Sequence, residues 1–379
     1  KLKKYQDWLF KCSAYHMALN IIDIDKQTVA PTAGAGYRDA RSAFLAGELF
    51  SLETDPKIVE LLKDLKDDPK VDTENKRAIQ LYYKQALDTL CIPKEEFVAF
   101  EKLCSESFDA WLLAKSKADY SLFAPYLEKV IEGKKKLYDY RNSNLSIYNQ
   151  MLDDFEPGMD EEKYDAFFAA LKERLVPLIQ KVTKAKQLRE DFLAQSFPVE
   201  EQKKFMEGLL EYLHFDSSWG YQNESEHPFT SWTCENDCRT TTKYLENNVI
   251  SAILSTVHEV GHAYYEHNIN PKYDGMILSE GVSSGMHESQ SRLCENYLGR
   301  TLAFWKYHYP KLQKHFPKQL GEVSLEEFYQ AVNRSKPSFI RTEADELTYP
   351  LHVLIRYEIE KGLFNGSIST KGLDKTWNA

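Results

Sequence analysis

The stretch of this sequence with the clearest chemical potential is HEVGH at positions 258–262, in which a glutamate follows the first of two histidines. Residues four apart lie on one face of an α-helix, so the imidazoles of His258 and His262 could bind one metal ion. Glu259 could then act as a general base toward a water molecule. The competing interpretation is a helix with two hydrogen-bonded histidines. Gly261 argues against it, because glycine inside a helix costs about 1 kcal/mol and needs a local reason.

A catalytic zinc ion takes three protein ligands and keeps one position for water, so the chemistry requires a third ligand. Three glutamates that follow the motif are candidates: Glu280, Glu288 and Glu295. Glu280 stands at an expected helix start, whereas Glu288 and Glu295 are seven residues apart and share one helix face. Spacing does not choose among the three.

The motif lies in a segment, 247–267, that predicts a helix. It begins with asparagines suited to a cap, and its apolar residues repeat with helical spacing. These residues are Val249, Ile253, Val257 and Val260. Directly before it, residues 220–244 are rich in Thr, Ser, Trp and Tyr. Within them, 229–234 and 239–245 could pair across CENDC as a β-ribbon beside the helix that carries HEVGH.

Helical periodicity dominates the first two hundred residues. Its best example is an apolar series with steps of 3, 4, 3 and 4, formed by Phe168, Leu171, Leu175, Leu178 and Val182. Breaks that contain Pro or Gly fall at 28–40, 66–77 and 153–162. The sequence therefore predicts an all-α, mainly helical protein that carries one small ribbon.

Composition limits the classes of partner. The 379 residues include 48 basic and 58 acidic side chains, and the net charge of -10 disfavours nucleic acid or an anionic membrane as the main partner. No run of about eighteen apolar residues exists, so we expect no membrane span. The first twenty residues are typical of an amphipathic helix, not a signal peptide. Six scattered cysteines indicate no disulfide framework, and we expect a cytoplasmic protein.

Five short motifs occur in order along the second half of the chain. They are HPFT (227–230), DCRTT (237–241), HEVGH (258–262), HESQSR (287–292) and IRTEAD (340–345). Together they resemble the carboxypeptidase Taq family of metallocarboxypeptidases, whose signature includes H-P-F, D-x-R-x-T, H-E-x-x-H, H-E-S-Q and I-R-x-x-A-D.

The resemblance implies a fold and an activity. The fold would be a helical one with a deep substrate groove, as in the angiotensin-converting-enzyme and neurolysin architecture. It would form a single domain over 1–379, with 1–219 as a helical groove wall and 220–362 as the catalytic part. The family also carries G-x-x-Q-D-x-H-W near its C-terminus. That motif has no match here, so we expect the printed chain to be truncated. The implied activity is broad removal of single residues from peptides with a free C-terminus, by a homodimer that uses zinc or cobalt.

The resemblance also assigns roles to residues of the motifs. His258, His262 and Glu288 would be the metal ligands, which is a choice that spacing left open. Glu259 would be the base that takes the proton of a metal-activated water and delivers it to the leaving amine.

An enzyme that acts at C-termini must bind a free carboxylate, for which a fixed arginine is suited. In a predicted helix over 338–362, bent by Pro350, Arg341 and Asp345 are four residues apart. Arg341 could bind the substrate while Asp345 orients it. The alternative is an ordinary Arg–Asp surface pair.

Other residues near the ribbon have two interpretations each. Arg239 is a competing carboxylate binder, or it forms a strand-end salt bridge with Asp237. His227 could hydrogen-bond substrate or cap a turn. His287 is interpreted as packing, with a contact to a metal ligand as the alternative, and Tyr349 as a wall of the groove. The ribbon itself could hold an extended peptide by strand addition.

Two further functions remain open on the sequence. A zinc endopeptidase or dipeptidase would have the same metal ligands and no pocket for the terminal carboxylate. An inactive helical scaffold that binds peptides would keep the motif as a relic. The intact Glu259 argues against the scaffold, because such a protein has no reason to retain the base.

Overall fold

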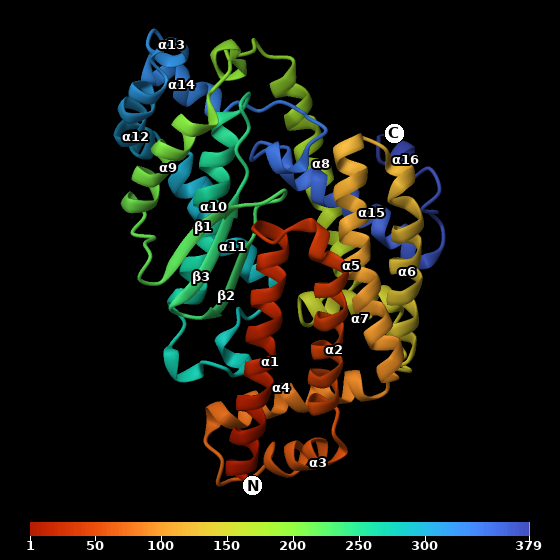
Figure 1. Ribbon diagram of the computed structural model, residues 1–379. Coiled ribbons are helices and arrows are strands. Elements are labelled where there is room, and N and C mark those ends of the chain that lie inside the picture. The colour runs from red at the N-terminus through yellow and green to blue at the C-terminus, as the bar shows by residue number, and fades with distance from the viewer. Residues whose placement is uncertain (379) are drawn as a thin grey trace.

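A computed structural model describes residues 1–378 of the chain. It is mainly helical with one small sheet, as the sequence predicts (Figure 1). Nine helices precede the sheet: α1 (Leu2–Thr28), α2 (Ala35–Glu53), α3 (Pro56–Leu65), α4 (Thr73–Leu90), α5 (Lys94–Lys117), α6 (Ala124–Asp139), α7 (Ile147–Phe155), α8 (Glu161–Thr183) and α9 (Val199–Tyr212). Seven follow it within the described residues: α10 (Val249–His267), α11 (Ser284–Cys294), α12 (Leu302–His315), α13 (Pro317–Leu320), α14 (Leu325–Val332), α15 (Tyr349–Asn365) and α16 (Leu373–Asn378).

The helix boundaries follow local signals in the sequence. Asp55, Asp72 and Asp160 cap α3, α4 and α8, each accepting a hydrogen bond from a backbone N–H of the first turn. All three predicted breaks are present, and each is shorter than expected, because α2, α4 and α8 already begin at Ala35, Thr73 and Glu161. No helix within residues 1–378 is long and apolar enough to cross a membrane.

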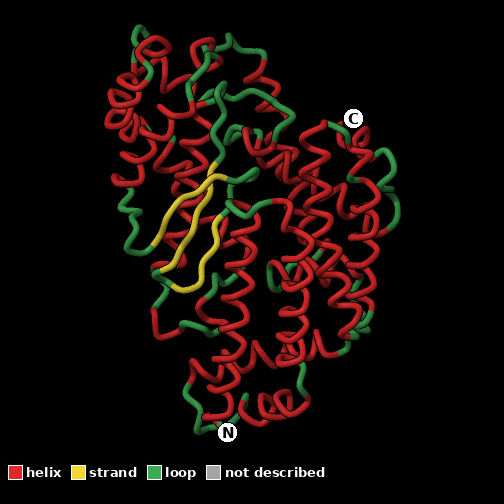
Figure 2. Tube along the Cα trace, viewed as in Figure 1, coloured by secondary structure: helices red, strands yellow, loops and turns green. Residues whose placement is uncertain are grey.

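The sheet has three strands in the order β1-β3-β2 (Figure 2). The strands are β1 (Gly220–Glu224), β2 (Thr230–Cys234) and β3 (Asp237–Thr242). β2 and β3 pair antiparallel and form the predicted ribbon, although β3 begins and ends earlier than the predicted 239–245. β1 pairs parallel to β3 and was not predicted. Its sequence, GYQNE, has no apolar alternation to indicate a strand.

One face of this sheet covers α10 and thereby fixes the position of the HEVGH motif. The Cys238 thiol lies 3.7 Å from the backbone oxygen of Ala263, and the Thr242 hydroxyl donates to the backbone oxygen of Ala252 at 3.3 Å. The adjoining side of α10 carries the apolar series predicted from the sequence, and each of its members is 1% exposed: Val249, Ile253, Val257 and Val260. α10 is thus packed against the sheet and into the main core, to which Cys238 of β3 also belongs.

The helix predicted over 338–362 is wrong in its first part. Residues 333–348 form a loop with one short 3-10 turn, η7 (Arg341–Glu343), and α15 begins only at Tyr349. Pro350 lies in the first turn of α15, so it starts a helix and does not bend one. Proline suits that position because its fixed φ is helical and its missing N–H would have no partner there.

Candidate metal centre

The two helices that carry the motif residues, α10 and α11, cross at Gly261. A Cβ atom added at Gly261 would lie 2.9 Å from the Cα of Ser291 and 3.0 Å from the Cβ of Cys294. Only glycine allows this approach, which explains the helix-weakening residue inside HEVGH. The crossing brings Glu288, one turn before Ser291, over the histidines of α10.

We expect Gly261→Ala to weaken metal binding although glycine is not a ligand. The added methyl group meets backbone of α11, so the helices must separate and carry Glu288 away from the two histidines. Chelator competition should show a metal affinity lowered by at least tenfold. Gly208→Ala is the matched control, because a Cβ there meets nothing within 4 Å. Equal metal affinities in the two variants would contradict this role of the crossing.

Three side chains converge at the crossing. The Nε2 atoms of His258 and His262 each lie 3.5 Å from Oε2 of Glu288. One ligand atom from each residue lies within 4.8 Å of the others, the one such group of His, Cys, Asp or Glu found in residues 1–378. Two imidazoles and one carboxylate are the ligand set of many catalytic zinc sites. Of the three candidate glutamates, the structure brings Glu288 to both imidazole Nε2 atoms.

The charges of these groups fit a cation. Burial lowers the pKa of His258, but hydrogen bonds with Glu288 and Glu295 raise it on balance to about 9. Burial alone would raise the pKa of Glu288, yet hydrogen bonds from His258 and His262 hold it far below its usual range. His258 thus retains a proton beside the carboxylates of Glu288 and Glu295. A divalent metal ion bound between these groups would replace that proton.

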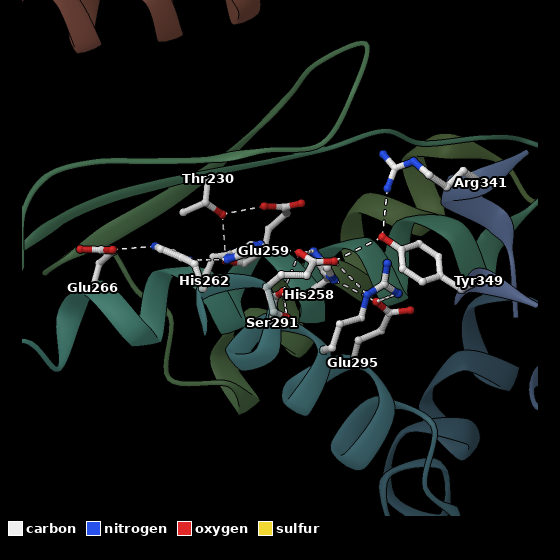
Figure 3. A network of polar contacts seen from close by, with 12 residues as sticks. Thr230, His258, Glu259, His262, Glu266, Ser291, Glu295, Arg341 and Tyr349 are labelled. Atoms are coloured by element: carbon white, nitrogen blue, oxygen red, sulfur yellow. Dashed lines mark hydrogen bonds and ion pairs between the residues drawn. The ribbon is translucent and has the colours of Figure 1, made fainter. Parts of the chain in front are cut away.

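The Nδ1 atoms of His258 and His262 point away from Glu288, and each contacts a further side chain (Figure 3). Nδ1 of His258 lies 2.9 Å from Oε2 of Glu295. Nδ1 of His262 lies 2.6 Å from Nδ1 of His287, whose Nε2 lies 2.6 Å from the carboxylate of Glu266. Such partners fix the ring orientation of metal-binding histidines. His287 therefore contacts His262 directly, and a contact to one of the candidate ligands was only the alternative interpretation of the sequence.

Glu259 faces the same space but makes a different contact. It is 6% exposed, and its Oε2 accepts a hydrogen bond of 2.7 Å from the Thr230 hydroxyl on β2. Burial raises the pKa of Glu259, against the lowering effect of His258 and of the Thr230 hydrogen bond. A carboxylate with a raised pKa is suited to accept and return a proton near neutral pH.

These residues line a cleft of about 1990 Å³. One wall includes residues of α4, α5 and the α7–α8 connection, and the other belongs to β2, α10, α11 and the loop before α15. His227, Arg341 and Asp345 line the cleft together with the three converging side chains. His227 is exposed there, in the connection between β1 and β2.

Arg239 lies apart from them and corrects one expectation. Its Nε and Nη2 donate to the two carboxylate oxygens of Asp237 at 2.7 and 2.8 Å. Side chains alternate along a strand, so Arg239 faces away from α10, whereas its buried neighbours Cys238 and Thr240 face it. Arg239 is not among the residues that line the cleft. The strand-end salt bridge is the interpretation that the geometry favours.

Asp345 also differs from its expected role. Its carboxylate accepts hydrogen bonds from the hydroxyls of Ser335 and Thr348, both at 2.7 Å, and from backbone N–H groups around it. It therefore organises the loop before α15. In the described chain, the partner of the Arg341 guanidinium is the Tyr349 hydroxyl at 3.0 Å, not Asp345. The expected pairing rested on helical spacing in a segment that is a loop.

Several residues of the site were not found from the sequence. Glu266 lies four residues after His262 on α10, so helical spacing could have placed it on the same face. Thr230 belongs to the HPFT stretch and contacts Glu259 only because β2 lies against α10. No local signal indicates that contact.

Comparisons with known proteins agree over nearly the whole chain. The family model described as carboxypeptidase Taq (M32) metallopeptidase matches residues 4–379. A relative from Bacillus subtilis, named Carboxypeptidase 1, is 40% identical over 380 aligned residues, covering 99% of this chain and 75% of the relative. Thermostable carboxypeptidase 1 from Thermus thermophilus is 35% identical, with coverage of 93% of this chain and 72% of the relative. The crystal structure of an M32 carboxypeptidase from Deinococcus radiodurans R1 is similar with a TM-score of 0.89 at 32% identity, covering 99% of this chain and 76% of that one.

Proposed function

This chain belongs to the carboxypeptidase Taq (M32) family of metallopeptidases, and we propose that it removes single residues from peptide C-termini with His258, His262 and Glu288 as the ligands of its divalent metal ion. The observation that carries the ligand assignment is the convergence of these three side chains, with ligand atoms within 4.8 Å of one another, in a large cleft. Broad tolerance of the C-terminal side chain is part of the proposal.

We propose zinc or cobalt as the metal. Imidazole nitrogens with one carboxylate suit either ion, whereas magnesium and calcium prefer oxygen ligands alone. When bound, the ion would supply Lewis-acid chemistry that polarises the scissile carbonyl group and makes water more acidic.

Glu259 is the proposed general base. Its carboxylate would accept the proton of the attacking water and pass it to the amine that leaves. Its burial, its raised pKa and its single hydrogen bond from Thr230 support this role, because one carboxylate oxygen is held while the group stays in the cleft.

Strand β2 is the proposed guide for the peptide backbone. It is an edge strand of the sheet. The carbonyl group of Trp232 points outward from the sheet, because it accepts a hydrogen bond from Asn20 of α1 at 3.2 Å. The backbone N–H and carbonyl groups of Thr230, two residues earlier, point outward from the sheet as well. The Thr230 side chain contacts Glu259. A peptide that pairs with Thr230 would bring its carbonyl group to the base and the metal site.

Arg341 is the proposed binder of the terminal carboxylate, and His227 lies in the same cleft as a second candidate contact. The test compares a peptide that has a free C-terminus with the same peptide amidated. In Arg341→Gln, we expect the preference of kcat/KM for the free peptide to fall by about 10- to 150-fold, the equivalent of a charge-assisted hydrogen bond worth ~1.5–3 kcal/mol.

Arg239→Gln is the matched control, since it removes an arginine from the sheet face that points away from α10. We expect it to retain the preference for the free peptide. Loss of the preference in Arg239→Gln alone would assign carboxylate binding to Arg239 and contradict the role of Arg341.

We further propose that the protein works in the cytoplasm as a homodimer and that residues 1–219 and 220–362 form the groove wall and the catalytic part of a single domain. The six cysteines are all free thiols, which suits a reducing compartment. The dimer rests on the family resemblance.

A further inference from the structure

The Tyr349 hydroxyl lies between two parts of the proposed machinery. It accepts a hydrogen bond of 3.0 Å from Nη1 of Arg341 and lies 3.4 Å from Oε1 of Glu288 (Figure 3). The tyrosine ring is fixed as well, because the guanidinium carbon of Arg292 lies 3.7 Å from its centroid. One phenol therefore joins the arginine proposed for the substrate carboxylate to a proposed metal ligand.

The direction of these hydrogen bonds follows from the groups themselves. A guanidinium has only donors, so the phenolic oxygen must accept from Arg341. The single hydroxyl proton then points to Oε1 of Glu288, 3.4 Å away. The charge of Arg341 thus sets the orientation of the Tyr349 hydroxyl, and the hydroxyl acts on Glu288.

The two oxygens of Glu288 have separate surroundings. Oε2 lies near the Nε2 atoms of both histidines, at 3.5 Å each. Oε1 is held by Nε of Arg292 at 3.0 Å and by Tyr349. These contacts turn one oxygen toward the histidines and the other away, so the carboxylate would offer a single oxygen to a metal ion.

We propose that Tyr349 is a positioning residue that couples the carboxylate-binding Arg341 to the metal ligand Glu288. This inference rests on the proposed function. A substrate carboxylate at Arg341 competes with the phenol for guanidinium donors, so the hydroxyl bond to Glu288 changes when the substrate is in place. Binding of the substrate C-terminus at Arg341 would thereby affect the metal ligand Glu288 through the Tyr349 side chain. The sequence had suggested Tyr349 only as a wall of the groove.

The test is a double-mutant cycle in metal affinity, measured by chelator competition without substrate. It uses the wild type, Tyr349→Phe, Arg341→Gln and the double variant, with zinc as the probe. We expect Tyr349→Phe to weaken zinc binding by about tenfold, within the range for outer partners of metal ligands. Arg341→Gln should weaken binding about threefold in the wild type and leave it unchanged in the Tyr349→Phe background.

Phenylalanine keeps the ring beneath Arg292, so the variant retains that packing. Tyr357→Phe is the matched control on α15, because its hydroxyl bonds Asp165 at 2.8 Å, away from the cleft. A second readout is the kinetics on free-acid peptides, in which Tyr349→Phe should lower kcat more than it raises KM.

The outcomes separate the inference from the proposed function. Zinc affinity unchanged in Tyr349→Phe, or additive effects of the two substitutions, would overturn the coupling. A wild-type protein that binds no zinc would overturn the proposed metal centre itself. A wild type that binds zinc and shows the expected cycle, yet cleaves free and amidated peptides alike, would support the link between Arg341 and Glu288 and remove carboxylate recognition as its purpose.

Discussion

Glu259→Gln will lower kcat/KM for peptide hydrolysis by about 10²–10⁴-fold, the usual effect of losing a general base, while metal content stays at the wild-type level. Glutamine keeps the size of the side chain and can still accept the hydrogen bond from Thr230, but its amide cannot take a proton from water. The measurement is kcat/KM on a free-acid peptide together with the zinc content of the purified variant.

Thr230→Val serves as the control for this variant. It removes the hydroxyl that holds one oxygen of Glu259 and leaves the carboxylate, so we expect a loss of about tenfold or less. Glu259→Gln activity within a factor of about three of the wild type, with full metal content, would show that another group is the base.

The second large effect concerns Glu288, the carboxylate of the proposed metal site. Glu288→Gln should weaken zinc binding by more than the roughly 10- to 100-fold that losing an outer partner costs, and activity should be lost with the metal. The substitution replaces an anion that both histidines face with a neutral amide. Chelator competition gives the zinc affinity, and titration of activity with added zinc shows how much is restored.

The zinc affinities of variants at two other glutamates, Glu295 and Glu280, can be compared with that of Glu288→Gln. Glu295→Gln weakens only the support of His258 and should lower zinc affinity by about 10- to 100-fold. Glu280→Gln changes a carboxylate that lies in the cleft outside the three converging side chains, and we expect wild-type affinity. Loss of zinc from Glu280→Gln with affinity retained in Glu288→Gln would reverse the assignment of the third ligand.

The parts of the site that were predictable are those whose signals are local. The α10 helix carried a cap and an apolar series, and the sheet covers the helix where the β-ribbon was expected. Gly261 was recognised as needing a reason, and that reason is the approach of α11. The choice between Glu288 and Glu295 could not be made from local signals in the sequence. Seven residues are nearly two helical turns, so both lie on one face about 10 Å apart along the axis, and spacing does not select between them. The family resemblance favoured Glu288, and the crossing of α10 and α11 brings that residue to both histidines.

The prediction failed where helical spacing occurred without a helix. Arg341 and Asp345 have the right separation, but Asp345 uses its carboxylate to hold the loop before α15. Pro350 fits a helix start as well as a bend, and the choice depends on the backbone hydrogen bonds of the preceding loop. Arg239 belongs to a family-like motif, yet strand alternation turns it away from the cleft. The direction of a side chain on a short strand depends on pairing register, which the sequence alone does not fix.

The most direct measurement of the central claim follows one peptide and its amidated twin by mass spectrometry during incubation with the wild-type protein, with and without a chelator. We expect stepwise loss of single residues from the free C-terminus, no loss from the amidated peptide, arrest by the chelator and recovery with zinc or cobalt. Internal cleavage of both peptides would keep the metal centre and contradict the carboxypeptidase mechanism with Arg341. Cleavage that continues after the metal has been removed would contradict the metal centre as well.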